Sequence, residues 1–308
     1  MVSRRRFLAT TATTGLVVAA ERLLPAGAQA QSRRRLIVDS QVHLWLANTP
    51  ERPWANGATR AQLPEPFAIE RLVPMMDEAG VDRAVLVPPT LEGERIDYVQ
   101  EAVKRYPGRF GIMARIDITK PERAERLPTW RNQPGVLGVR VNYGFEWLTN
   151  GMADRFWPAA EKAGLPVMFL TNGQTSLMGR VAERHPTLTL IIDHMGISTA
   201  LMRNGQWQDE ILASAALARY QNVSVKLSSI PLFSSEAYPF RDMTPHIRRL
   251  FDAFGPQRCH WGTDVTNSYA KATYRQRVTH FTEELAFLSQ DDKDWIMGRS
   301  ILARLRWT

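Results

Sequence analysis

The sequence has very little cysteine and no glycine-rich turn of the kind that binds dinucleotides. Its one cysteine, Cys259, excludes an internal disulfide and any cysteine-based metal cluster. The missing glycine-rich turn argues against an open, doubly wound sheet that holds a dinucleotide. The formal net charge is +8, yet the basic residues are scattered and form no stripe interleaved with aromatics. We therefore expect no nucleic-acid binding.

The first thirty residues have the order of an export signal. Arg4 and Arg5 precede a mildly apolar stretch, and "AGAQA" follows with Ala28 and Ala30 placed as in a cleavage site. This order predicts a twin-arginine signal peptide over residues 1–30 and export to the periplasm, with a disordered basic tail as the alternative. The apolar stretch is too short for a stable membrane span, so we expect no membrane association after cleavage.

Short apolar, β-branched runs alternate with stretches of helical apolar spacing throughout residues 31–308. Strands that are apolar on both faces and alternate with helices are typical of a parallel sheet covered by helices. Eight such units predict a single-domain α/β protein, a (β/α)8 TIM barrel. The eight runs cover residues 36–43, 82–88, 110–117, 136–142, 166–171, 188–194, 223–228 and 259–264.

Polar side chains stand at the ends of several of these runs. Chemistry in such a barrel lies at the carboxyl ends of the strands, and burying a charge there is costly unless the charge is paired or used. Each residue alone has a structural interpretation, such as a core histidine, a helix cap or an ion pair, but five polar strand ends together predict a functional site. These residues are Gln41, His43, Arg140, Asn142, Asp193, His194, Lys226, Ser228 and Asp264.

Five segments together resemble the amidohydrolase superfamily. They are "VDSQVHLW", "GVRVN", "LPVMF", "IIDHMG" and "CHWGTD", and the similarity runs from about residue 36 to residue 307. The chain is most similar to the amidohydrolase-related branch, which includes pyrone-dicarboxylate lactonase, sulfomuconolactone hydrolase, sugar-acid lactonases and some aromatic-acid decarboxylases. The resemblance implies a hydrolase that acts on a small anionic lactone.

The match to the superfamily's metal ligands is incomplete. Members usually carry His-x-His on strand one, a histidine on each of strands five and six, and an aspartate on strand eight. His43, His194 and Asp264 match this pattern, whereas Gln41 replaces the first histidine and Leu170 or Thr171 stands at the strand-five position.

Two cofactor states are compatible with this donor set. A catalytic zinc usually needs three protein ligands and a water. His43, His194 and Asp264 would just supply three for a single Zn or Mn, with Gln41 as a poor fourth. The loss of two ligand positions favours metal-free hydrolysis, a mode found among the lactonases resembled here. We therefore expect no cofactor, with a single divalent metal as the alternative.

The expected reaction assigns a role to each residue of the site. Asp264 would be the general base for the attacking water, while His194 and His43 would polarise the carbonyl and hold the oxyanion. Gln41 would donate a hydrogen bond to the substrate.

The substrate's anionic group would bind Arg140 and Lys226, because a guanidinium and an ammonium both bind carboxylate or sulfonate. Asn142 and Trp45 would add contacts, and Trp147 has the same two interpretations as Trp45: pocket wall or packing of a loop on the barrel rim. The alternatives are a mononuclear metal-dependent hydrolase or decarboxylase, and an exported small-molecule binding protein on a degenerate barrel. Assembly into a homo-oligomer stays open.

Overall fold

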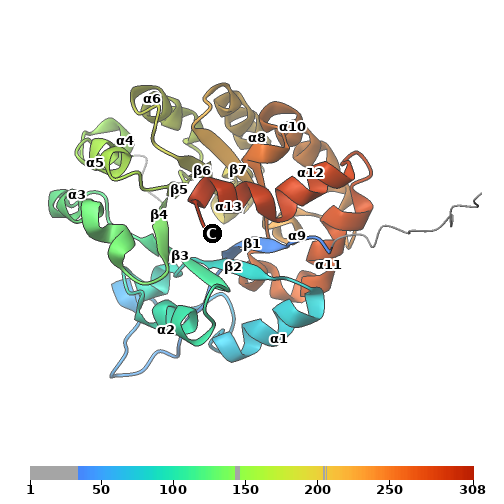
Figure 1. Ribbon diagram of the computed structural model, residues 1–308, viewed down its shortest axis with the longest axis horizontal. Coiled ribbons are helices and arrows are strands. Elements are labelled where there is room, and N and C mark those ends of the chain that lie inside the picture. Colours follow the sequence, from blue (N-terminus) through green and yellow to red (C-terminus); the bar gives the residue numbers. More distant parts are fainter. Residues whose placement is uncertain (1–33, 143–145, 204, 206) are drawn as a thin grey trace, which may run out of the picture. The chain divides into compact units, whose positions relative to one another are not determined.

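The computed structural model describes residues 34–308 except 143–145, 204 and 206. One sheet holds eight parallel strands that are adjacent in chain order, and the last strand returns to the first: the backbone N–H of Asp264 donates to the carbonyl of Gln41 at 2.9 Å. The predicted (β/α)8 barrel is therefore confirmed (Figure 1). The predicted signal peptide lies outside the described residues.

Each of the eight predicted runs contains one strand. Val, Ile, Leu and Phe fill these runs because both faces of each strand are covered, the outer face by helices and the inner face by the opposite strands. The strands are β1 Val38–Val42, β2 Arg83–Leu86, β3 Phe110–Arg115, β4 Val136–Asn142, β5 Val167–Leu170, β6 Leu190–Ile192, β7 Val223–Ser228 and β8 Cys259–Gly262.

Helices surround the sheet, and Figure 1 shows them as an outer layer around the strands. None of the helices in the described ranges is long and apolar enough to cross a membrane. They are α1 Ile69–Ala79, α2 Asp97–Arg105, α3 Pro121–Arg126, α4 Glu146–Thr149, α5 Phe156–Lys162, α6 Met178–Arg184, α7 Thr199–Arg203, α8 Trp207–Ala216, α9 Ile230–Phe233, α10 Thr244–Phe254, α11 Tyr274–Thr279, α12 Gln290–Asp294 and α13 Ser300–Leu305.

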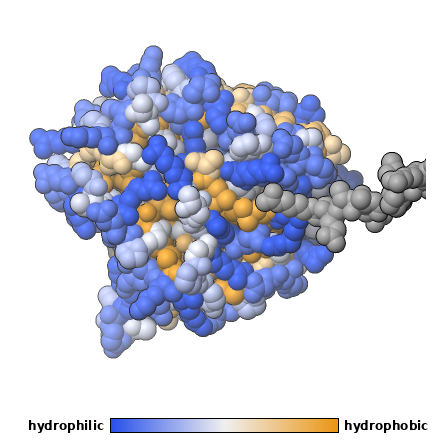
Figure 2. All heavy atoms as spheres, in the orientation of Figure 1, coloured by the Kyte–Doolittle hydropathy of each residue, from blue (hydrophilic) through white to orange (hydrophobic). Residues whose placement is uncertain are grey.

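The amino-terminal end of the barrel is filled by apolar side chains. Val38, Met113 and Ile191 of the strands pack against Ile301 and Leu305 of α13, and Figure 1 shows α13 lying across this opening. Hydrophobic residues appear near the centre of the same face in Figure 2, within a mostly hydrophilic surface. Because this end is closed by packing, the polar strand residues are gathered at the opposite, carboxyl-terminal end.

Candidate active site

Four of the predicted site residues line one cavity at the carboxyl ends of the strands. The cavity has a volume of about 160 Å³, and His43, Arg140, His194 and Asp264 form part of its wall. His43 directly follows β1, Arg140 lies on β4, and His194 and Asp264 lie in the turns that follow β6 and β8. The structure therefore brings these four residues, which are far apart along the chain, to the wall of one cavity.

Four residues at the cavity have left-handed backbone conformations. The φ angles are 49° at Asn172, 51° at His194, 63° at Ser229 and 48° at Asp264, and each residue follows the end of a strand. Such a conformation costs a non-glycine residue roughly 1–3 kcal/mol and persists where the surrounding structure holds it. Four of them around one cavity indicate that the turns are shaped to aim these side chains.

The Asp264 carboxylate is buried and accepts hydrogen bonds from two neighbouring side chains. Ser229 Oγ donates to Oδ2 at 2.6 Å, and Asn267 Nδ2 lies 2.9 Å from Oδ1 and 2.8 Å from Oδ2. His43 Nε2 lies 3.2 Å from Oδ1. Burial alone would raise the pKa of Asp264, but the neighbouring His194 and His43 and the Ser229 hydroxyl hold that pKa well below its usual range. Asp264 is therefore ionised, and its side chain does not cap the helix that follows.

His194 is oriented through its Nδ1 atom. This atom lies 2.8 Å from Ser229 Oγ and 2.9 Å from Ser228 Oγ. A carboxylate only accepts hydrogen bonds, so the single proton of Ser229 goes to Asp264 and Ser229 must accept from Nδ1–H. Burial lowers the pKa of His194 to about 4, so the ring is neutral at pH 7. Its Nε2, for which the described residues supply no hydrogen-bond partner, then presents a lone pair at the cavity.

His43 is held between the backbone and Gln41. Its Nδ1 donates to the carbonyl of Val87 at 2.5 Å, and its Nε2 lies 3.3 Å from Gln41 Nε2. Lys226 Nζ donates to Gln41 Oε1 at 2.7 Å, which fixes the amide so that its NH2 group points to His43. Gln41 is completely buried and does not line the cavity. It supports His43 rather than contacting a ligand there.

A buried carboxylate stands between two cations beneath the cavity. Arg140 Nε lies 2.6 Å from Asp193 Oδ2, and Lys226 Nζ lies 3.0 Å from Oδ1. Burial raises the pKa of Asp193, but Lys226 and Arg140 outweigh it and bring the pKa to about 2. Lys226 is completely buried and outside the cavity wall. Its predicted contact with substrate is thus replaced by a contact with Asp193, and Arg140 is the cation left at the wall.

The other two predicted contacts are not placed at the cavity. Trp45 is fully buried against Phe67, with ring centroids 6.0 Å apart, and lies outside the cavity wall. Its packing interpretation therefore holds, because its ring fixes the loop after β1 to the barrel. The side chain of Asn142 lies outside what the structure describes.

The sequence prediction missed two residues of the site. Ser229 was not singled out, although a second serine directly after the strand that ends at Ser228 was a visible signal. Asn267 lies three residues after Asp264, which is the spacing at which a side chain folds back across a turn. Ser229 has a left-handed conformation itself and Asn267 follows the left-handed Asp264, so neither position could be assigned to the site from the sequence alone.

A sequence profile of the amidohydrolase family matches residues 38–300, so the chain belongs to this family. It is an enzyme, a hydrolase. The chain is 28% identical over 238 residues to 4-sulfomuconolactone hydrolase of Hydrogenophaga intermedia, covering 75% of this chain and 74% of that protein. It is 25% identical over 244 residues to L-fucono-1,5-lactonase of Burkholderia ambifaria, covering 74% of this chain and 79% of that protein.

A solved structure supports the fold. An amidohydrolase from Burkholderia multivorans, crystallised once with HEPES and once with zinc, has TM-scores of 0.72 and 0.71 to this chain at 20% identity. The match covers 89% of this chain and 100% of that chain. At this identity the likeness establishes the barrel and no more.

The donor groups of this chain do not fit the single divalent metal that the sequence left as the alternative. Within the described ranges, no group of three or more His, Cys, Asp or Glu side chains is arranged to hold a metal ion. Gln41 turns its oxygen to the Lys226 ammonium and its NH2 to the lone pair of His43. Both oxygens of Asp264 already accept hydrogen bonds from Asn267. Of the candidate ligands, His194 alone thus keeps an uncommitted lone pair, on Nε2, whereas a catalytic zinc usually needs three protein ligands.

Proposed function

We propose that this enzyme hydrolyses a small anionic lactone without a metal. The observation that carries the proposal is the chain of contacts from Asp264 through Ser229 to His194, which ends in an unoccupied Nε2 at a cavity that Arg140 also lines. Two relatives with lactone-hydrolysing names, at 28% and 25% identity, support the choice of substrate class.

The attacking water gives its proton to His194. Its Nε2 accepts the proton as the water oxygen attacks the carbonyl, and the Asp264 charge stabilises the resulting imidazolium through Ser229. An acid behind a histidine has the same effect in serine hydrolases. The sequence predicted the opposite roles, with Asp264 as base and His194 as carbonyl donor. The hydrogen bonds favour His194 as the base, because a neutral His194 with a proton on Nδ1 can accept a hydrogen bond at Nε2 but cannot donate one there.

The tetrahedral adduct then collapses with loss of the ring oxygen. The C–O bond of the ring breaks, His194 returns the proton to the departing alkoxide, and the product is a hydroxy acid. Among the described residues of the cavity wall, Arg140 is the one permanent cation, so it stabilises the negative charge that develops on the carbonyl oxygen. Ring strain and an activated leaving group make a lactone suitable for this site, which lacks a strong electrophile.

A panel of γ- and δ-lactones with and without carboxylate or sulfonate groups tests the proposal. We expect acid release from anionic lactones at the same rate with and without chelator, and none from Asp264→Asn. Activity that disappears with chelator and returns with Zn or Mn would support a metal-dependent hydrolase instead. Binding of lactones without any turnover would support the binding-protein alternative.

The proposal includes export of the chain by the twin-arginine route and cleavage near Ala30. The paired Arg4 and Arg5 before an apolar stretch support it. Amino-terminal sequencing of the protein from a periplasmic fraction should start near Gln31. A chain that starts at residue 1 and stays in the cytoplasm would contradict it.

A further inference from the structure

We propose that Asn172 selects the substituent that the lactone carries, because its side-chain NH2 group donates hydrogen bonds to a carboxylate or sulfonate at the mouth of the reacting cavity. This inference rests on the proposed lactone hydrolysis and adds the residue that binds the negative charge of the substrate. Asn172 lies two residues after the end of β5 and forms part of the cavity wall.

Asn172 lies nearer the mouth of the cavity than the reacting groups do. Arg140 on β4 is the register partner of Met168 on β5, and Asn172 follows Met168 by four residues toward the carboxyl end of the barrel. Asn172 is exposed to solvent, whereas Arg140 and His194 are buried. A substituent that extends from the reacting ring toward solvent on this side of the cavity therefore passes Asn172.

The amide of Asn172 is oriented by the segment that carries His194. The hydroxyl of Ser198, four residues after His194, donates to Asn172 Oδ1. Ser198 Oγ itself accepts from the backbone N–H of Leu201 at 3.3 Å, which leaves its own proton for Asn172. An amide has one acceptor and two donors. The acceptor is thus used by Ser198, and the two N–H groups of Nδ2 have no partner among the described residues.

Asn172 also has a structural interpretation, as a turn residue that ties the end of β5 to Ser198. Its φ of 49° lies in the left-handed region, which asparagine adopts more readily than most residues do. This interpretation accounts for the backbone and for the amide oxygen. It does not account for two unpartnered N–H groups at the wall of a cavity, so a decisive test has to remove the donors and keep the turn.

The wall of the cavity suits an anion at this position. Among the described wall residues Asp264 is the only carboxylate, and it already accepts from Ser229 and Asn267. A second wall amide, Gln62, also accepts a hydroxyl proton at its oxygen, from Thr266, and its NH2 has no partner in the described ranges. Such donors bind oxygen atoms, and a hydrogen bond to a charged oxygen is the stronger kind. The favoured substituent is therefore a carboxylate or a sulfonate.

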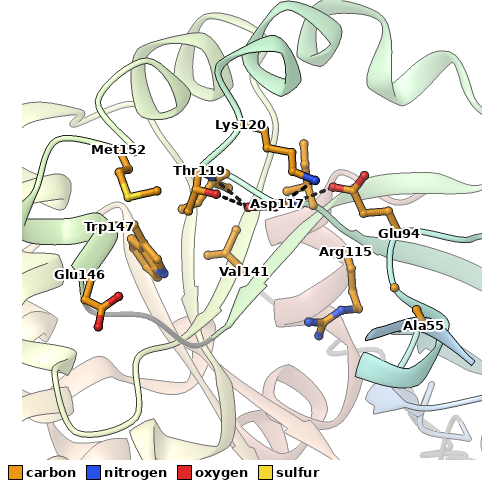
Figure 3. A pocket seen from close by; sticks show the side chains of 13 residues that line it. Ala55, Glu94, Arg115, Asp117, Thr119, Lys120, Val141, Glu146, Trp147 and Met152 are labelled. Carbon is orange, nitrogen blue, oxygen red and sulfur yellow. Dashed lines mark hydrogen bonds and ion pairs between the residues drawn. The ribbon is translucent and has the colours of Figure 1, made fainter. Parts of the chain in front are cut away.

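A larger hollow at the barrel rim does not bind this substituent. It has a volume of about 560 Å³ and, within the described part of the chain, shares no lining residue with the reacting cavity. Three acidic side chains of its lining outnumber the two basic ones, and Figure 3 shows them as Glu94, Asp117 and Glu146. The negative charge of the substrate therefore belongs at the mouth of the reacting cavity itself.

Two ring ketones test the inference on the full chain, because a ketone presents a carbonyl as a lactone does but cannot be hydrolysed. Cyclopentanone-3-carboxylate carries the charged substituent, and cyclopentanone lacks it. Ligand-observed NMR titrations measure the two dissociation constants. We expect the unaltered protein to bind the keto acid about tenfold more tightly than cyclopentanone, or more, as for the gain of a charge-assisted hydrogen bond.

Asn172→Asp removes the donors and keeps the turn. An aspartate still accepts from Ser198 and tolerates the left-handed conformation, but it presents a negatively charged oxygen to the substituent in place of the NH2 group. We expect this variant to bind the keto acid about ten- to hundredfold more weakly. Its affinity for cyclopentanone should change by less than about threefold, which also shows that the cavity is intact.

Gln174→Glu is the matched control, because it adds the same charge to the same turn outside the cavity wall. Its affinity for the keto acid should change by less than about threefold. Equal weakening of both probes by Asn172→Asp would assign Asn172 a structural role and overturn the inference. An unchanged affinity of Asn172→Asp for the keto acid, or the same loss in Gln174→Glu, would overturn it too.

Equal affinity of the unaltered protein for the two probes, including no measurable binding of either, would also contradict the assignment of Asn172. Neither probe is turned over, so these titrations decide the role of Asn172 whether or not a lactone is hydrolysed. The lactone panel decides the proposed function separately, because it measures acid release and does not depend on the probes.

Discussion

Replacing Ser229 with alanine tests how the proton leaves the attacking water. Ser229 Oγ joins Asp264 Oδ2 at 2.6 Å to His194 Nδ1 at 2.8 Å. A hydrogen bond to a charged group contributes roughly 1.5–3 kcal/mol, and 1.36 kcal/mol is a tenfold change in rate. We therefore expect Ser229→Ala to lower kcat about ten- to hundredfold. Ser228 still holds Nδ1 at 2.9 Å, so the loss should stay below that of Asp264→Asn.

The pH dependence of kcat/KM separates the two candidate proton acceptors. With His194 as acceptor, activity falls on the acid side at about pH 4, the pKa that burial gives this histidine. Ser229→Ala removes an acceptor that favours the imidazolium, so this acid limb should move to lower pH. With Asp264 as acceptor the limb lies further into the acid range, and loss of the Ser229 donor raises the pKa of Asp264 and moves the limb upward.

The measurement is a pH series of initial rates, with circular dichroism at each pH to exclude unfolding. Ser228→Ala is the control, because Ser228 contacts His194 without contacting Asp264. It should lower kcat less than Ser229→Ala does. An acid limb that rises in Ser229→Ala would refute the assignment of His194 as acceptor and return that role to Asp264. A kcat unchanged in Ser229→Ala would refute the relay itself.

Three further predictions concern the buried charges. Asp193→Asn leaves the Arg140 and Lys226 cations without a carboxylate and should lower the free energy of unfolding by about 3–5 kcal/mol, whereas Lys226→Met leaves one matched pair and should cost less; urea titration compares them. Burial lowers the pKa of His194 from 6.5 to about 4. The contribution of His194 to the free energy of unfolding is therefore complete above pH 6.5 and is lost as the pH falls toward 4, by up to about 1.4 kcal/mol per pH unit. His194→Gln should flatten this slope in urea titrations at stepped pH. The single variant Gln41→His should bind no zinc, because the Lys226 ammonium stays beside it. The double variant Gln41→His, Lys226→Met should bind more zinc, as measured by metal analysis after dialysis. Equal zinc in the two variants would contradict competition between the ammonium and the metal.

The sequence predicted the barrel because buried parallel strands have a strong signature. The runs 136–142 and 223–228 became β4 and β7 with the same bounds, and the other strands differ from their predicted ranges only at their ends. The convergence of His43, His194 and Asp264 followed from a general property of barrels, that strand ends share one face. Burial and strand position were therefore enough to predict that these three side chains lie at one cavity.

The sequence could not show which side chains the polar residues at the strand ends contact. Lys226 was expected to bind substrate, but a strand position does not show whether an ammonium points at the cavity or at Asp193, 33 residues earlier. The role of Ser229 depends on a left-handed turn, with φ of 63°, that a serine rarely adopts.

The glutamine on the first strand has a physical reason in this arrangement. Its oxygen accepts a hydrogen bond from the Lys226 ammonium at 2.7 Å, and its NH2 lies 3.3 Å from His43 Nε2. The Gln41 amide therefore links His43 to the positively charged Lys226. A histidine at position 41 would bring a second imidazole ring that competes with His43 for hydrogen-bond donors. A neutral imidazole cannot place its acceptor toward Lys226 and its N–H toward His43 with the geometry that the Gln41 amide provides. The amide thus fixes the tautomer of His43 from the buried side. In the proposed metal-free hydrolysis, the Lys226 ammonium supplies positive charge near the first strand, and proton transfer belongs to the groups that follow β6, β7 and β8.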